Sequence, residues 1–164
     1  MDANIILAIL VFSPVVILTL FRANAATAFL ALCLGSVLGS FVAKDLVSAL
    51  KGYIAPPTDV TATIASLVLL WLPVVLVAIF MMKTIAPKQR LVNAIPALAV
   101  GLLGTLLSVP FFTPELRSSV EATDIWKSIE SYKALIVILG TAISLGLLRM
   151  RKKGDDHLKK GKHH

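Results

Sequence analysis

The sequence is poor in the residues on which most catalytic and redox chemistry depends. It contains one cysteine, Cys33, so an intramolecular disulfide is excluded. Its three histidines lie in the C-terminal tail, and it has no His-Glu-x-x-His, Gly-x-Ser-x-Gly or phosphate-binding glycine loop. We therefore expect a protein that is not an enzyme and that holds no metal and no cofactor.

Charge is missing from long stretches of the chain. Hydrophobic residues make up 57% of the 164 positions and mean hydropathy is +0.89, whereas a soluble domain is about 45–50% apolar. The excess is concentrated in five runs, each close to the length of about 20 residues that crosses a bilayer. The pattern predicts an all-α polytopic membrane protein with five transmembrane helices, at residues 4–21, 25–43, 61–82, 91–112 and 134–148.

No ionisable residue lies inside these five runs. Charged groups within a membrane span usually mark an ion or proton pathway. Their absence argues against a proton relay or an ion-coupled mechanism.

Basic residues cluster at the ends of the apolar runs. The net charge of +7 would suit a nucleic-acid partner, but this distribution is typical of membrane orientation, and we expect no nucleic-acid binding. With the C-terminus in the cytoplasm, eleven of the 16 Lys and Arg residues lie inside and five outside. The sequence thus predicts an external N-terminus, a single transmembrane domain over residues 1–148, and residence in the plasma (cell inner) membrane.

Two segments of the sequence look like copies of one helical hairpin. "FSPVV" at Phe12–Val16 is echoed by "WLPVV" at Trp71–Val75, and "NAATA" at Asn24 by "NAIPA" at Asn93. The landmark prolines are offset by 59 positions and the asparagines by 69. Such self-similarity indicates an internal repeat. Because the first and third spans would cross in the same direction, the two hairpins would be parallel, related by an axis along the membrane normal.

Pro14 and Pro73 lie near the middle of the first and third runs. A proline removes one backbone donor and weakens the helix around it. We consider two interpretations, a pair of hinges and a pair of static kinks that aid packing; proline is common in transmembrane helices, which favours the second.

Small residues recur at helical spacing in the second and fourth runs. Such ridges let helix backbones approach closely. We expect them to form contacts within the bundle, with a homodimer seam as the alternative, and Trp71 to pack on one of them. The candidate helix-packing residues are Ala31, Gly35, Gly39, Ala97, Gly101 and Gly104.

Two polar segments flank the last run. Residues 114–132 begin after a candidate Thr113 cap and contain a candidate capping box, Ser118 with Glu121, so they predict either a helix on the outer surface or an early start of the fifth span. Residues 149–164 are expected to form a basic, disordered cytoplasmic tail. The tail residues expected to contact anionic lipid are Arg149, Arg151, Lys152 and Lys153.

These patterns favour two functional hypotheses. The first is an integral membrane protein that acts by helix packing, as an accessory, assembly or scaffold subunit, in a homodimer or a larger membrane complex. The alternative is a small transporter or oligomeric channel protomer for an apolar or lipid-like substrate. The alternative predicts a cavity at membrane depth between the hairpins, lined partly by Ser13, Ser36, Thr105 and Ser108.

Overall fold

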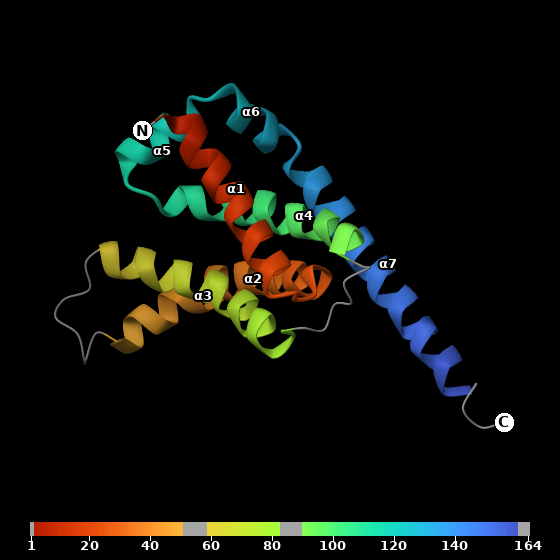
Figure 1. Cartoon of the computed structure of the whole chain (residues 1–164). Helices are drawn as coiled ribbons and strands as arrows, with labels where there is room; N and C mark the ends of the chain where they lie inside the picture. The colour runs from red at the N-terminus through yellow and green to blue at the C-terminus, as the bar shows by residue number, and fades with distance from the viewer. Residues whose placement is uncertain (1, 51–58, 83–89, 161–164) are drawn as a thin grey trace.

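The computed structural model describes residues 2–50, 59–82 and 90–160, and contains no strand among them. Five helices are long and apolar enough to cross a membrane, as the sequence predicts. Two further short helices and one 3-10 turn connect the fourth to the fifth of these (Figure 1). The elements are α1 (Ala3–Leu20), α2 (Ala25–Leu50), α3 (Asp59–Phe80), α4 (Arg90–Ser108), η2 (Val109–Phe111), α5 (Pro114–Glu121), α6 (Asp124–Ser131) and α7 (Lys133–Lys160).

Two helices continue well beyond their apolar runs, and α4 ends at Ser108, before the predicted end of its span at position 112. α2 continues to Leu50, beyond the predicted end of the span at position 43. α7 continues to Lys160, so residues 149–160 are helical where the sequence predicted a disordered tail. Hydropathy marks where lipid contact ends, whereas a helix stops only where its backbone hydrogen bonding stops.

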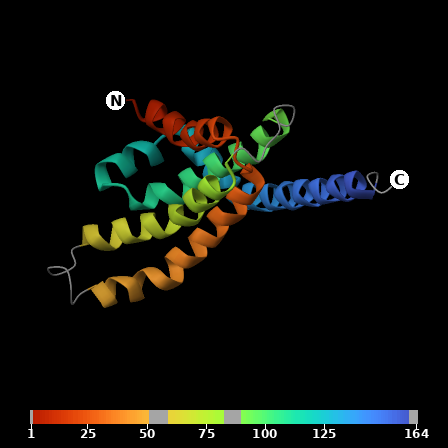
Figure 2. The same cartoon turned by 60° about the horizontal axis from the view of Figure 1, so that its bottom comes forward.

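The long helices do not pack in chain order. α1 packs on α4, α4 on α2, and α2 on α3, while α7 lies against both α2 and α4. Figures 1 and 2 show α2 and α3 side by side, with α7 projecting away from the other helices toward the C-terminus. The two pairs α1–α4 and α2–α3 therefore join through α2 and α4.

Close contacts set the relative directions of these helices. Gly35 lies against Leu70 and Gly39 against Ser66, so α2 and α3 run in opposite directions. Gly101 lies against Val11, while Asn93 bonds Ala23, so α1 and α4 are also antiparallel. α2 and α4 run in the same direction, because Asn93 lies beside Ala25 and Gly104 beside Leu32.

The turn between α1 and α2 is held by hydrogen bonds to carbonyls of α1 and to the Asn93 side chain of α4. Arg22 adopts φ 54°, in the left-handed region that usually favours glycine. The Arg22 and Ala23 amides donate to the carbonyls of Thr19 and Leu18, which is a Schellman ending. From α4, the buried Asn93 side chain accepts a hydrogen bond from the Ala25 amide and donates one to the Ala23 carbonyl, both at 3.0 Å.

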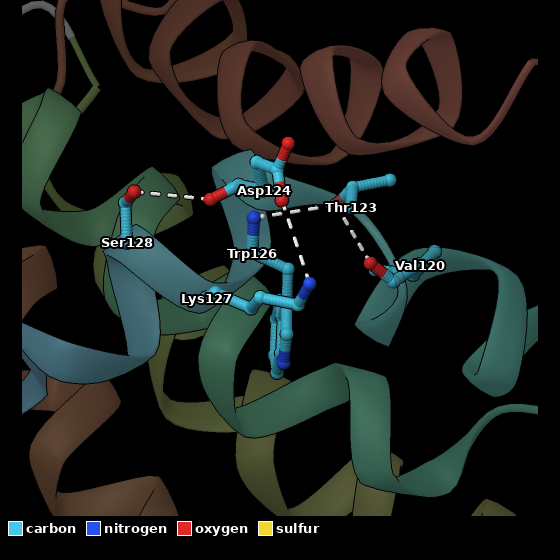
Figure 3. Close-up of polar contacts among 6 residues, drawn as sticks. All are labelled: Val120, Thr123, Asp124, Trp126, Lys127 and Ser128. Carbon is cyan, nitrogen blue, oxygen red and sulfur yellow. Dashed lines mark hydrogen bonds and ion pairs between the residues drawn. The ribbon is translucent and has the colours of Figure 1, made fainter.

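The segment before α7 forms two short helices, whereas the sequence left open one surface helix over residues 114–132 or an early start of the fifth span. The break falls at Thr123, whose hydroxyl accepts the Trp126 amide at 3.2 Å and caps α6 (Figure 3). The expected capping box is wrong: Ser118 donates to the Glu115 carbonyl inside α5, and Glu121 pairs with Arg117. Thr113 does occupy the N-cap position of α5, although its side chain makes no capping bond.

α6 packs on the α1–α4 pair through Trp126. Figure 3 shows the Trp126 indole directed from α6 toward the neighbouring helices, where it is buried. It joins a cluster with Leu7, Val11, Leu106 and Val109. Tyr132, at the end of α6, is exposed, whereas Trp126 is part of the core.

Candidate functional site: an apolar crevice between α1 and α3

A crevice of about 500 Å³ lies between α1 and α3. This volume falls in the range of about 300–1,000 Å³ that is usual for small-molecule sites. Its walls exist because α1 packs on α4 and α3 packs on α2, so the two helices stand apart. The lining residues are Ile9, Leu10, Ser13, Pro14, Ile17 and Leu18 from α1, Leu67, Trp71, Val74, Val75 and Ala78 from α3, and Ser108 and Phe112 at the end of α4 and after η2.

The crevice has an exposed rim and a buried floor. Ile9, Ile17 and Val75 are exposed, whereas Leu18, Val74 and Ser108 are buried. All of these except Ser108 are apolar, and no charged residue occurs in the lining given above. The rim belongs to α1 and α3, two of the helices that are long and apolar enough to cross a membrane.

The crevice is long as well as apolar. Its α1 wall extends from Ile9 to Leu18, which at about 1.5 Å per residue is roughly 14 Å. This is about half of a hydrocarbon core about 30 Å thick. The site therefore suits an extended chain better than a small compact solute.

One polar pair lies at the floor. The Trp71 indole Nε1 donates a hydrogen bond of 3.1 Å to the Ser108 hydroxyl, linking α3 to α4. The six-membered ring of Trp71 rests on Gly104, one turn before Ser108 on the same face of α4. A hydroxyl has two acceptor lone pairs and one donor, so Ser108 keeps hydrogen-bonding capacity after accepting from Trp71.

Two glycines position the walls. A methyl group at Gly101 would overlap the Val11 carbonyl, and one at Gly35 would overlap the Leu70 carbonyl. α1 and α3 can therefore lie directly on the backbones of α4 and α2. Close approach of this kind is the main use of small residues between membrane helices.

The predicted ridge residues all lie within the bundle. Ala31 and Ala97 are buried, and Gly39 faces the Ser66 carbonyl. Trp71 packs on Gly104, as expected. The contacts described here use these residues inside one chain, whereas the homodimer seam stays a hypothesis.

The four polar residues predicted to line one cavity are divided among three places. Ser13 and Ser108 line the crevice, and Ser36 lines a second pocket between α2, α3, α4 and the start of α7. Thr105 is buried and donates to the Gly101 carbonyl instead. The Trp71–Ser108 bond was not predicted, although the i, i+4 spacing of Gly104 and Ser108 could have indicated it.

The two mid-span prolines have unequal places. Both prolines are buried, but only Pro14 is among the residues that line the crevice. α1 and α3 each continue through their proline as one helix. Neither helix is divided into two segments, so a hinge at either residue stays a prediction.

Chemical groups suited to metals are sparse. Among the described residues, no group of three or more His, Cys, Asp and Glu side chains is placed to hold a metal ion. Of the tail residues predicted to contact lipid, Arg149 is exposed, and the side chains of Arg151, Lys152 and Lys153 lie outside the described part of the structure.

Comparison with known protein families, with curated proteins and with solved structures finds no match to this chain.

Proposed function

We propose that this protein is an integral membrane protein that takes up an apolar, lipid-like molecule sideways from the bilayer into the crevice between α1 and α3. The observation that carries this proposal is the apolar cavity of about 500 Å³ bounded by two membrane-spanning helices. It corresponds to the transporter alternative among the sequence-based hypotheses. The proposal assigns no catalytic step and no cofactor to the chain.

The chemistry of the lining supports a long apolar occupant. Each methylene group removed from water contributes about 0.8 kcal/mol, but a chain that is already in lipid gains little by moving into protein. Selection must then come from shape and from the polar end of the molecule. Ser108 and Ser13 are the crevice groups that can hydrogen bond a hydroxyl, ester or carboxyl group.

The directions of the helices support the internal repeat. α1 is antiparallel to α4, α4 is parallel to α2, and α2 is antiparallel to α3, so α1 and α3 run the same way. The carbonyls that a methyl group at Gly101 or at Gly35 would overlap belong to Val11 and Leu70, which are also 59 positions apart, like Pro14 and Pro73. We propose two parallel hairpins with the N-terminus outside and the C-terminus in the cytoplasm of a plasma membrane protein.

Quenching of Trp71 fluorescence by brominated lipid tests the proposal. Trp126→Phe leaves Trp71 as the single tryptophan, and the protein is reconstituted with phosphatidylcholine brominated along its acyl chains. We expect strong quenching that falls when Ser13→Leu fills the crevice. Ala8→Leu adds the same side chain at an exposed position of α1 outside the lining and should change nothing. Equal quenching in the two leucine variants would contradict occupancy of the crevice.

A second candidate function is that of an accessory or scaffold subunit. The observation that favours it is the exposure of α7, of whose 18-residue membrane window 11% is buried, against 56% for α4. A photoreactive side chain at Ile138, which is 66% exposed, would then cross-link to one protein of defined mass. Leu20, which is 73% exposed on α1, serves as the control position. Lipid adducts alone at both positions would contradict a protein partner on α7.

A further inference from the structure

A second pocket has a different chemistry from the crevice. It has a volume of about 410 Å³ and lies between α2, α3, α4, η2 and the first residue of α7. Leu70, Leu106 and Leu107 give it apolar walls, and Leu70 and Leu106 are buried. Three serines and Lys133 also line it, so the lining combines apolar side chains with one basic group.

Of the three basic residues Arg117, Lys127 and Lys133, Lys133 is the one outside the ion pairs of the described residues. Arg117 pairs with Glu121 at 2.6 Å, and Lys127 pairs with Asp124 at 3.4 Å. Lys133 is exposed and takes part in no ion pair among the described residues. Glu130, the nearest acid in the sequence, is also exposed and lies on α6, before the start of α7.

The serines add hydrogen-bond acceptors and small volume to the same pocket. The Ser36 hydroxyl donates to the Cys33 carbonyl at 2.7 Å, and the Ser40 hydroxyl donates to the Val37 carbonyl at 2.8 Å. Their own protons are therefore used within α2, and the pocket offers Lys133 as its charged donor. Lys133 also opens α7, so the positive end of that helix dipole lies at the same place.

We propose that this pocket binds an anionic membrane lipid, with one acyl chain between α2, α3 and α4 and the phosphate of its headgroup against Lys133. A lysine beside a membrane surface attracts anionic lipid by about 1 kcal/mol. The apolar interior and the unpaired ammonium together select a charged amphiphile over a neutral lipid. This site is separate from the α1–α3 crevice and does not rest on the function proposed for it.

Native mass spectrometry of the full chain in mild detergent tests the site, with phosphatidylglycerol and phosphatidylcholine of matched acyl chains as probes. We expect phosphatidylglycerol to bind more tightly, and Lys133→Gln to weaken it about fivefold, the change that corresponds to about 1 kcal/mol. Lys127→Gln removes an equal charge at a residue already paired with Asp124 and should leave binding unchanged. Equal weakening by the two variants, or equal affinity for the two lipids, would overturn the proposal.

A steric variant tests the position of the acyl chain. Ser40→Leu places a larger side chain in this pocket from an exposed position, whereas Ser13→Leu fills the other crevice. We expect Ser40→Leu to reduce binding of phosphatidylglycerol at least as much as Lys133→Gln, and Ser13→Leu to leave it intact. Loss of phosphatidylglycerol binding in Ser13→Leu alone would assign the lipid to the crevice and contradict this site.

Discussion

The indole nitrogen of Trp71 and the hydroxyl of Ser108 form a hydrogen bond between α3 and α4. The two residues are 37 positions apart in the chain. Their bond lies at the floor of the crevice, on the side of the wall that α3 forms. It links α3, which packs chiefly on α2, to the α1–α4 pair. Both its strength and its specificity can be measured.

A double-mutant cycle measures the strength of this bond. Trp71→Phe and Ser108→Ala each remove one partner, and the combined variant closes the cycle. Hydrogen bonds between membrane helices average about 0.6 kcal/mol, and we expect a coupling energy of that order in reversible unfolding from detergent. Additive single effects would mean that the two groups do not interact. Ser119→Ala, on the exposed face of α5, is the control for removal of a serine hydroxyl.

Gly35 and Gly101 should be the least tolerant glycines of the bundle. Alanine at either position places a methyl group against a backbone carbonyl, of Leu70 or of Val11, which cannot move aside without moving its helix. We expect each substitution to lower the free energy of unfolding by about 1–3 kcal/mol. Gly146→Ala is the matched control, because no heavy atom lies within 4 Å of the added carbon. It should be neutral or stabilising by up to about 1 kcal/mol, because alanine is the better helix former. Equal effects at all three positions would contradict close helix approach.

Asn93 should stabilise the α1–α2 turn from a distance. Asn93→Ala leaves the Ala25 amide and the Ala23 carbonyl without their buried partner. The expected cost is about 1–3 kcal/mol in the free energy of unfolding. Asn24→Ala removes a bond of 3.2 Å to the Ala26 amide within the same turn and should cost about 1 kcal/mol, as the loss of an N-cap does. A smaller effect at Asn93 than at Asn24 would count against the bridge from α4.

Cysteine labelling tests the proposed orientation. Cys33→Ser gives a chain without cysteine, into which Ser119→Cys and Met150→Cys are introduced singly at exposed positions. We expect a membrane-impermeant maleimide to label Ser119→Cys on intact cells and Met150→Cys only after permeabilisation. The reverse pattern would invert the topology, and labelling of both on intact cells would contradict opposite sides for α5 and the end of α7.

The five spans could be predicted from the sequence because a hydrocarbon core fixes the length and polarity of what crosses it. The ridge of small residues on α4 was also predicted, but not which of its members meets α1. At the offset of 69 positions, Gly35 aligns with Gly104. In the structure, however, the glycine of α4 that lies against a backbone carbonyl of the neighbouring helix, as Gly35 does in α2, is Gly101. Residues three and four apart share one face of a helix, so spacing alone does not tell which glycine receives the neighbouring backbone.

The presence of a cavity could be predicted from the sequence, but its lining residues could be predicted only in part. A cavity near Ser13 and Ser108 follows from two separated hairpins, whereas the burial of Thr105 and the place of Ser36 in another pocket depend on how α2 and α4 rotate against each other. The break at Thr123 was missed because Ser118 and Glu121 have the spacing of a capping box. Val120 and Trp126, on either side of the break, pack in one apolar cluster, a tertiary contact that local spacing does not reveal.

Arg22 serves two requirements that favour different amino acids. The backbone there has a positive φ. This conformation is strained for arginine but not for glycine. In the proposed orientation, the same residue is the basic side chain of the first cytoplasmic turn, and a glycine would remove that charge. A designer who exchanged it for stability would thus weaken a signal read during insertion, before any of the packing described above exists.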